Sequence, residues 1–204
     1  MKRYSAYLLV GPPGSGKGTQ GKALGILPGF FHCSCGDVFR SLDKRTPLGR
    51  IFNDLSIKGQ LVPDNMTVEV WLSHIKARVA DGSFNPEKSH LVLDGIPRNI
   101  AQARSMVDHI EVKRVFHLNC CLKRTLLQRL RHRATREKRL DDTSESIFRR
   151  RLEVYHQESK PLLDYYSRDL VSEIEADGPA HQVLLSILNC IIDHDGQGGT
   201  GTLW

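Results

Sequence analysis

Short apolar runs alternate with longer segments of helical spacing along this chain. The apolar runs stop at turn residues such as Gly11-Pro12 and Asp94-Gly95, which is typical of buried strands. The expected strands are residues 6–10, 30–34, 90–94, 113–118 and 170–176.

Between the strands, apolar positions recur every three or four residues, as on one face of a helix. Thr46-Pro47 supplies a cap residue and a proline at the first helical position, and Gly59 ends that helix. Asp64 is expected to cap the next helix. The apolar face of that helix comprises Val68, Trp71, Leu72, Ile75 and Val79. The other expected helices are residues 16–27, 36–44, 99–110 and 179–193.

The alternation of strands and helices predicts an α/β fold, with a parallel sheet covered by helices on both faces. Sheets of this kind bind ligands beyond the carboxyl ends of their strands. A chain of 204 residues suits one main domain with small insertions. We expect the Gly-rich residues 195–204 to form a flexible tail.

The net charge of the chain indicates which kinds of molecule it could bind. The net charge of +6 favours an anionic partner, which a nucleic acid, an acidic membrane or a phosphorylated small molecule could be. Residues 123–151 hold far more Lys and Arg than Asp and Glu, but not the series of interleaved aromatic side chains on which bases stack. No apolar run approaches the ~18 residues of a membrane span. We therefore expect neither a nucleic-acid nor a membrane partner.

The five cysteines form a poor disulfide framework, because the count is odd and Cys120-Cys121 are adjacent. Reduced thiols in a cytoplasm are the expected state. No Cys-x-x-Cys spacing is present, so zinc is not expected. The apolar stretch before Gly11 is too short for a signal sequence, which also favours the cytoplasm.

The strongest chemical signal is a phosphate-binding loop. Gly11 to Lys17 has the spacing Gly-x-x-x-x-Gly-Lys between an expected strand and an expected helix. Glycines allow several backbone N–H groups to point at one phosphate, and the helix N-terminus adds partial positive charge. Lys17 can then reach the β- and γ-phosphates of a nucleotide.

The loop departs from the general pattern after its lysine. Most such loops carry Ser or Thr on magnesium at that position, whereas this chain has Gly18, with Thr19 one residue later. Asp94 ends the strand expected beside the loop, where a carboxylate that orients Mg²⁺ would lie. The simpler alternative is that Asp94 only caps the strand end.

Six further motifs follow the loop in order along the chain. They are Gly36-Asp37-Val38-Phe39-Arg40, Gly59-Gln60-Leu61-Val62-Pro63-Asp64, Leu93-Asp94-Gly95-Ile96-Pro97-Arg98, Arg139-Leu140-Asp141-Asp142, Arg151-Leu152 with Tyr155, and Asp177-Gly178. With Gly14-Ser15-Gly16-Lys17-Gly18-Thr19-Gln20, this series resembles the nucleoside monophosphate kinases, specifically the adenylate kinases and the UMP/CMP kinases. The resemblance covers roughly residues 5–193.

The resemblance implies a P-loop NTPase fold with three layers and a five-stranded parallel sheet. It also implies a helical insertion that binds the nucleoside monophosphate and a short lid without zinc. The implied single kinase domain spans 1–194, with its core at 1–33, 65–128 and 152–194, the insertion at about 34–64 and the lid at about 129–142.

The implied activity is reversible transfer of the γ-phosphate of ATP to AMP, giving two ADP, by a monomer that uses Mg²⁺ with ATP. Arginines suit this chemistry, because each stays charged and binds phosphate oxygens in two places. The implied catalytic residues are Lys17, Arg98, Arg133, Arg139 and Arg151. The implied ATP-binding residues are Gly14, Ser15, Gly16, Lys17, Gly18, Thr19, Arg129 and Gly178. The implied AMP-binding residues are Cys35, Arg40, Gln60, Leu61, Val62, Gly95, Arg98, Gln102, Arg139 and Arg151.

Three points stay open. Counting from the aspartates at 141–142 selects Arg150, whereas the Arg-Leu-x-x-Tyr motif selects Arg151. Gln102 favours AMP, because an amide can pair with adenine in two places and UMP/CMP kinases have asparagine there. Cys35 replaces the threonine usual in adenylate kinases, so a UMP/CMP kinase is the first alternative. A non-catalytic P-loop nucleotide-binding protein is the second alternative, although such a protein would be expected to lack Lys17 or the phosphate-binding arginines, which are all present. The lid turn at 134–138 has no glycine, and its effect on activity also stays open.

Overall fold

The computed structural model describes residues 2–120, 122–137 and 144–197. Among them, five strands form one parallel sheet in the order β2-β3-β1-β4-β5. The strands are β1 (Tyr4–Val10), β2 (Phe30–Ser34), β3 (His90–Asp94), β4 (Ile110–Asn119) and β5 (Val171–Glu175). The expected α/β fold with a five-stranded parallel sheet is therefore confirmed.

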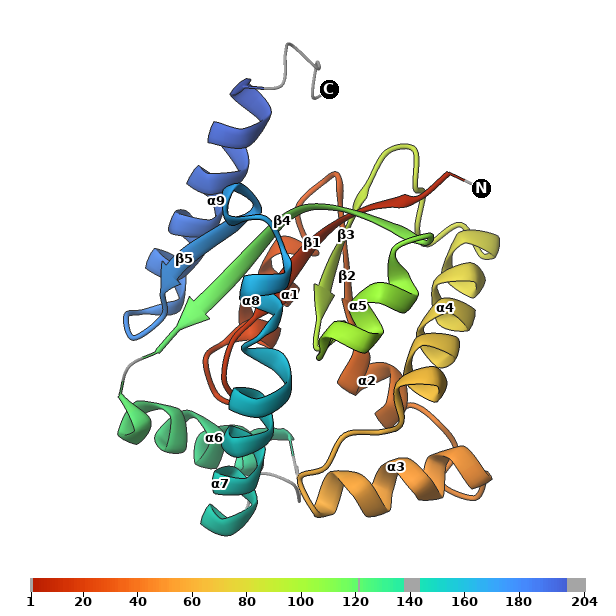
Figure 1. Cartoon of the computed structure of the whole chain (residues 1–204), viewed down its shortest axis with the longest axis vertical. Helices are drawn as coiled ribbons and strands as arrows, with labels where there is room; N and C mark the ends of the chain where they lie inside the picture. The colour runs from red at the N-terminus through yellow and green to blue at the C-terminus, as the bar shows by residue number, and fades with distance from the viewer. Residues whose placement is uncertain (1, 121, 138–143, 198–204) are drawn as a thin grey trace.

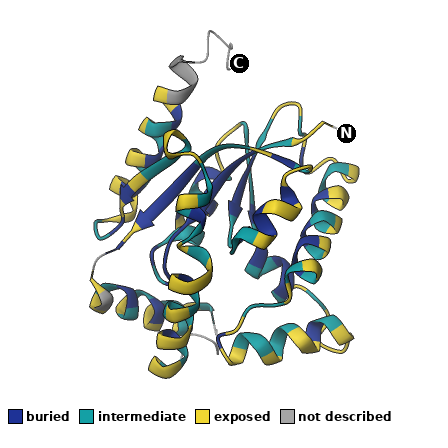
Figure 2. Ribbon diagram, viewed as in Figure 1, coloured by how far each residue is buried: buried dark blue, intermediate teal, exposed yellow. Residues whose placement is uncertain are grey.

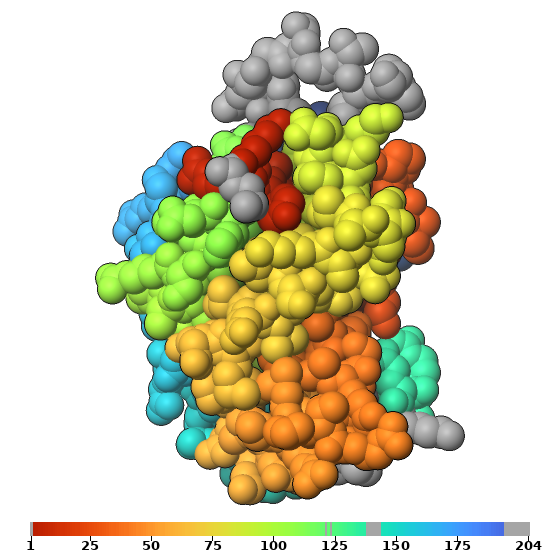
Figure 3. Space-filling model, turned by 90° about the vertical axis from the view of Figure 1, so that its right-hand side faces the viewer, coloured from red at the N-terminus to blue at the C-terminus, as the bar shows by residue number. Residues whose placement is uncertain are grey.

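The helices and helical turns connect these strands. They are α1 (Lys17–Leu24), α2 (Cys35–Arg40), α3 (Pro47–Ile57), α4 (Asp64–Ala80), α5 (Ile100–Met106), α6 (Lys123–Glu137), α7 (Glu145–Val154), the π-helical η2 (Tyr155–Ser159), α8 (Leu162–Tyr165), the 3-10 helix η3 (Arg168–Leu170) and α9 (Ala180–Gln197). Figure 1 shows α3, α6 and α7 grouped beyond the carboxyl ends of the strands, whereas the start of β1 and the end of α9 lie toward the opposite side of the molecule. Seen from the side, α3 and α4 form a continuous surface along one flank (Figure 3).

Alternation along β1 divides the buried apolar side chains into two layers. Figure 2 shows buried residues concentrated along the central strands. Leu8 packs in the cluster that holds Trp71 of α4 and Met106 of α5. Leu9 packs in the opposite cluster, with Leu24 of α1 and Ile187 of α9. The sheet is thus covered on both faces, as expected for parallel strands.

Several boundaries differ from the sequence expectations. The helix expected at 36–44 is α2 and ends at Arg40, where the Ser41 hydroxyl donates to the Val38 carbonyl at 2.7 Å. The helix expected at 99–110 is α5 and ends at Met106, with Asn99 as its cap. The strand expected at 113–118 is β4, which is longer and starts at Ile110. A register shift opposite Ala6 and Tyr7 interrupts the alternation of its side chains, so the sequence pattern did not reveal its first residues.

One further expectation was wrong. Asp64 does not cap α4 with its side chain. Its carboxylate instead accepts hydrogen bonds from Asn99 and Gln102. α9 continues to Gln197, and the flexible tail at 195–204 stays a prediction. Residues 198–204 lie outside the described part of the chain.

Candidate active site

A large cavity of about 920 Å³ opens beyond the carboxyl ends of the strands. Its walls are the loop after β1, α2, the segment after α3, the end of β3, α6, α7 and the start of α9. This is the position at which parallel α/β sheets bind ligands. A volume of this size is within the range of nucleotide-sized ligand sites.

The loop after β1 forms a cradle because its glycines adopt a backbone that side chains rarely allow. Gly14 and Gly16 have φ values of 88° and 100°. A Cβ on Gly14 would lie 2.8 Å from the carbonyl oxygen of Leu126, so the loop packs directly against α6. A Cβ on Gly16 would meet no described atom within 4 Å, which leaves the start of α1 open to the cavity.

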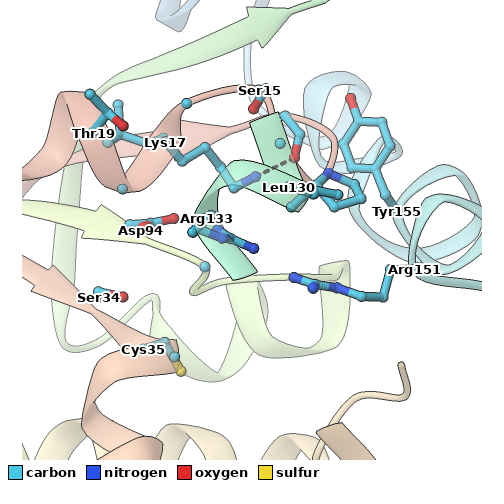
Figure 4. Close-up of a pocket in the computed structure, with 18 of the residues that line it drawn as sticks. Ser15, Lys17, Thr19, Ser34, Cys35, Asp94, Leu130, Arg133, Arg151 and Tyr155 are labelled. Atoms are coloured by element: carbon cyan, nitrogen blue, oxygen red, sulfur yellow. Dashed lines mark hydrogen bonds between the residues drawn. The ribbon is translucent and has the colours of Figure 1, made fainter. Parts of the chain in front are cut away.

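Lys17 lines the cavity, and its side chain lies above Arg133 in the view of Figure 4. Its ammonium group donates hydrogen bonds to the carbonyls of Gly11, at 2.7 Å, and Pro12, at 3.0 Å. Burial lowers the pKa of Lys17 to about 8, although Asp94 raises it. The charges of Arg98, Arg133 and Arg151 lower the pKa of Lys17 further. These side chains therefore act on one another within a single site.

Asp94 ends β3 beside the loop, as the sequence predicted (Figure 4). A Cβ on Gly18 would lie 3.4 Å from Oδ2 of Asp94, so glycine at this position lets α1 approach the carboxylate. Thr19 also lines the cavity. The hydroxyl of Ser15 is buried and has no hydrogen-bond partner among the described residues.

The predicted acceptor-binding residues line the opposite part of the cavity. Arg40 pairs with Asp37 at 2.6 Å, and Nε of Arg98 donates to the Gly95 carbonyl at 3.0 Å. Gly95 has a φ of 78°, and a Cβ there would lie 3.2 Å from Nη2 of Arg98, so glycine makes room for the guanidinium. Burial raises the pKa of the Cys35 thiol to about 11, which keeps it neutral. Gln60, Leu61 and Val62 also lie on this side.

Gln102 is buried at the same end, and its amide is oriented by two contacts. Oε1 accepts from the backbone N–H of Arg98 at 2.8 Å, and Nε2 donates to Oδ1 of Asp64 at 2.8 Å. Asp64 also accepts from Asn99 at 3.0 Å. An amide has two N–H groups and two acceptor lone pairs, so Gln102 keeps one of each for a ligand.

The predicted donor-binding residues gather around the loop between β5 and α9. Arg129 donates to the carbonyls of Ala176, at 2.6 Å, Asp177, at 3.1 Å, and Gly178, at 3.0 Å. Gln20 donates from Nε2 to the Ala180 carbonyl at 3.0 Å. Arg129 therefore ties α6 to this loop, and its role against an adenine ring stays a prediction.

The arginines of α6 and α7 complete the cavity. Figure 4 shows the guanidinium groups of Arg133 and Arg151 pointing toward one another below Lys17. Arg150 is half exposed and pairs with Glu153 at 3.3 Å, and it is not among the described residues of the cavity wall. Between the two alternatives from the sequence, the structure thus brings Arg151 to the cavity. Arg139 lies outside the described residues.

Sequence reasoning missed some residues of the wall. His132 and Arg136 lie on the cavity side of α6, three and seven residues after Arg129, so helical spacing from that arginine could have found them. Tyr155 was noted only as part of a motif, and it also lines the cavity. Gln20 ends the loop motif, and nothing in the sequence indicated its contact with α9.

The described residues contain no group of three or more His, Cys, Asp and Glu side chains placed to hold a metal ion. None of their helices is both long enough and apolar enough to span a membrane.

Comparison with known proteins agrees with this geometry. The model of the adenylate kinase family matches residues 9–171. An adenylate kinase of Prochlorococcus marinus is 36% identical, over 92% of this chain and 97% of its own length. Adenylate kinases of Thermus thermophilus and Streptomyces coelicolor are 33% and 31% identical, over 89% and 90% of this chain and 94% and 97% of their own lengths. The chain belongs to the adenylate kinase family.

Proposed function

We propose that this chain is a phosphotransferase that moves the γ-phosphoryl group of ATP reversibly to AMP and so forms two ADP. The observation that carries the proposal is the convergence of Lys17, Arg98 and Arg151 on one cavity, where their charges act on one another. Phosphoryl transfer requires this kind of site, because catalysis is mainly positioning and stabilisation of negative charge.

In the proposed complex, the phosphates of ATP occupy the loop of residues 14–19, and the base lies near Arg129 and Gly178. The open space at Gly16 supports this placement, and so does the Ser15 hydroxyl, which has no hydrogen-bond partner among the described residues and could donate to a phosphate oxygen. The ammonium of Lys17 would leave the carbonyls of its own loop and bind the β- and γ-phosphates. A phosphate beside it would offset the cost of burying its charge.

AMP would bind on the other side, within the predicted insertion of residues 34–64. Arg40 and Arg98 would hold its phosphate, and Gln60, Leu61 and Val62 would surround its base together with Cys35 and Gly95. Arg133 and Arg151, with the predicted Arg139 of the lid at 129–142, would surround the transferring group. An oxygen of the AMP phosphate then attacks the γ-phosphorus in line while the bond to ADP breaks. Closure of the insertion and the lid would exclude water as a competing nucleophile.

We propose Mg²⁺ as the metal that accompanies ATP. The residues near the loop fit a magnesium ion held mainly by phosphates and water, because Asp94 is the nearby carboxylate and Gly18 brings no hydroxyl. Asp94 would orient the water ligands, and the ion would neutralise charge that develops on the phosphates. The chain's cysteine pattern supports a cytoplasmic location, and we propose action as a monomer.

AMP is the proposed acceptor because Gln102 presents one N–H and one lone pair in a fixed orientation. Adenine offers the complementary pair, an acceptor at N1 and a donor at its amino group. The test is ADP formation from ATP·Mg²⁺ with AMP, dAMP, UMP, CMP or GMP in parallel. A strong preference for AMP supports the proposal. A preference for UMP or CMP overturns the acceptor, and ATP binding without turnover on any of them overturns the activity.

A further inference from the structure

A chain of three hydrogen-bonded side chains connects the sheet to the cavity wall. His117 of β4 lies directly opposite Glu173 of β5 in the strand register. Nδ1 of His117 is 2.7 Å from Oε2 of Glu173, and Nε2 is 2.8 Å from the hydroxyl of Tyr155. His117 and Tyr155 are each 7% exposed, so the contact between them is shielded from water.

The carboxylate of Glu173 accepts, so Nδ1 of His117 carries the proton that joins these two groups. The other nitrogen, Nε2, accepts from the hydroxyl of Tyr155 when the ring is neutral and donates to it when the ring is charged, so the contact exists in either form. Burial and the charge of Glu173 raise the pKa of Tyr155 to about 12, so this hydroxyl keeps its proton at neutral pH.

Tyr155 lies at the junction between α7 and the π-helical η2. Its backbone N–H donates to the carbonyls of Arg151 and Leu152, and its own carbonyl accepts from the N–H of Lys160 at 2.8 Å. Arg151 lies one helical turn earlier and points into the cavity (Figure 4). α7 runs directly into η2, and Phe148 of α7 packs in the hydrophobic core. Because Arg151 lies in the last turn of α7, its position depends in part on how this junction is held.

We propose that His117 is a positioning residue for phosphoryl transfer, which holds the hydroxyl of Tyr155 and thereby directs Arg151 toward the transferring group. The proposal rests on the proposed function of the cavity. Catalytic groups must be kept within about 0.5 Å of their working geometry. The guanidinium of an arginine near a helix end can be placed this accurately only when the helix itself is held in position. A π-helical turn next to the arginine provides a point at which the helix could otherwise shift.

The first test compares Tyr155→Phe, His117→Asn and His117→Gln with the unmodified chain. Asparagine places its amide near the position of Nδ1 and loses the contact with Tyr155, whereas glutamine reaches the position of Nε2 and can keep it. We expect Tyr155→Phe and His117→Asn to lower kcat about tenfold with the KM for ATP and AMP nearly unchanged, the pattern of an interaction needed in the transition state. His117→Gln should retain kcat within about threefold. Tyr165→Phe, the same change outside the cavity wall, should have no effect.

The second test places Tyr155→Phe in an Arg151→Ala background, with circular dichroism and thermal unfolding as folding controls. If Tyr155 acts through Arg151, it should lower kcat no further in that background. A full additional loss would overturn the proposal, as would wild-type kcat in Tyr155→Phe or equal losses in both His117 variants. The experiment also distinguishes the failure of this inference from the failure of the proposed function. No turnover by the unmodified chain overturns the proposed function and this inference with it, whereas an active enzyme indifferent to these substitutions overturns this inference alone.

Discussion

Lys17 interacts electrostatically with the other charged side chains of the site. Its ammonium is buried among three arginines and one carboxylate, and it uses the carbonyls of its own loop as partners. In the proposed function it moves from these carbonyls to the β- and γ-phosphates of ATP. We expect Lys17→Met to lower turnover at least ~10³-fold, if it removes ~4 kcal/mol of transition-state stabilisation. Lys2→Met, at an exposed ion pair with Glu87, is the control and should leave turnover unchanged.

The same lysine predicts a pH dependence of stability. Its pKa falls from 10.5 to about 8 on folding, so between these two values the unfolded chain binds more protons than the folded one. The contribution of Lys17 to the free energy of unfolding therefore rises with pH across this window. Urea unfolding at pH 7.5 to 10 should show this rise in the unmodified chain and lose it in Lys17→Met. An equal pH slope in both proteins would contradict the assignment.

Acceptor choice depends on the orientation of one amide. Asp64 accepts from Nε2 of Gln102, and the backbone N–H of Arg98 donates to Oε1, so these two contacts hold the amide in one orientation. In Asp64→Asn the neighbour can donate as well as accept, which removes one of the two restraints, and an amide that turns over presents the wrong pattern to adenine. We expect kcat/KM for AMP to fall about tenfold relative to that for UMP, whose N3–H and O4 offer the reverse pattern, the effect of one net hydrogen bond. Glu69→Gln, an exposed change on the same helix, should leave the ratio unchanged. Unchanged selectivity in both variants would show that Gln102 does not depend on Asp64.

At the scale of elements, Gly59 is the contact between the end of the α3 segment and α7. It has a φ of 67°, and a Cβ there would lie 3.1 Å from Cγ of Arg151 and 3.3 Å from the Ile147 carbonyl. Gly82 is a matched control, because its φ is 77° and a Cβ on it would meet no described atom within 4 Å. Alanine at either position should cost about 1 kcal/mol of stability through backbone strain.

The two glycines should differ in catalysis. Gly59→Ala presses on the stem of Arg151, so we expect its kcat to fall severalfold while Gly82→Ala keeps wild-type kinetics. Urea unfolding and steady-state rates on both variants measure the two effects separately. Equal kinetics in both variants would mean that α7 yields to the added methyl group without moving Arg151.

The sequence predicted strands correctly where turn residues mark both ends of an apolar run. β2 and β3 have the expected bounds, because each apolar run is closed by residues that break a strand. It failed where the outcome depended on distant partners. The start of β4 depends on pairing with β1 across a register shift. Asp64 was expected to cap α4, but its carboxylate accepts a hydrogen bond from Asn99 at the start of α5, which packs beside α4.

The candidate site shows the same division. The loop and Arg98 were readable as motifs, and the Arg-Leu-x-x-Tyr motif identified the arginine that faces the cavity. The contact of His117 with Glu173 was not readable, because it joins residues 56 positions apart through the register of β4 and β5. A sequence pattern can therefore predict sites built from residues that are close in the chain. Contacts between residues on neighbouring strands can be identified only from the fold.

At the scale of the whole molecule, the cavity joins two half-sites that the fold builds from separate segments. The loop after β1 and the start of α9 form one, and the segments around α2 and the end of β3 form the other. A ligand that spans both should therefore stabilise the fold more than either nucleotide alone, because binding to the folded state adds free energy that grows with affinity.

The probe for this prediction is an analogue with two adenosines joined by five phosphates. At 100 times its Kd such a ligand adds about 2.7 kcal/mol to the free energy of unfolding. We expect it to raise the midpoint of thermal unfolding at concentrations where ATP or AMP alone has little effect, and Arg98→Ala, on the acceptor side, to reduce that difference. If ATP alone stabilises the protein as much as the analogue at equal concentration, the second half-site contributes no binding. The cavity would then hold one nucleotide, as in a P-loop protein that binds without transferring.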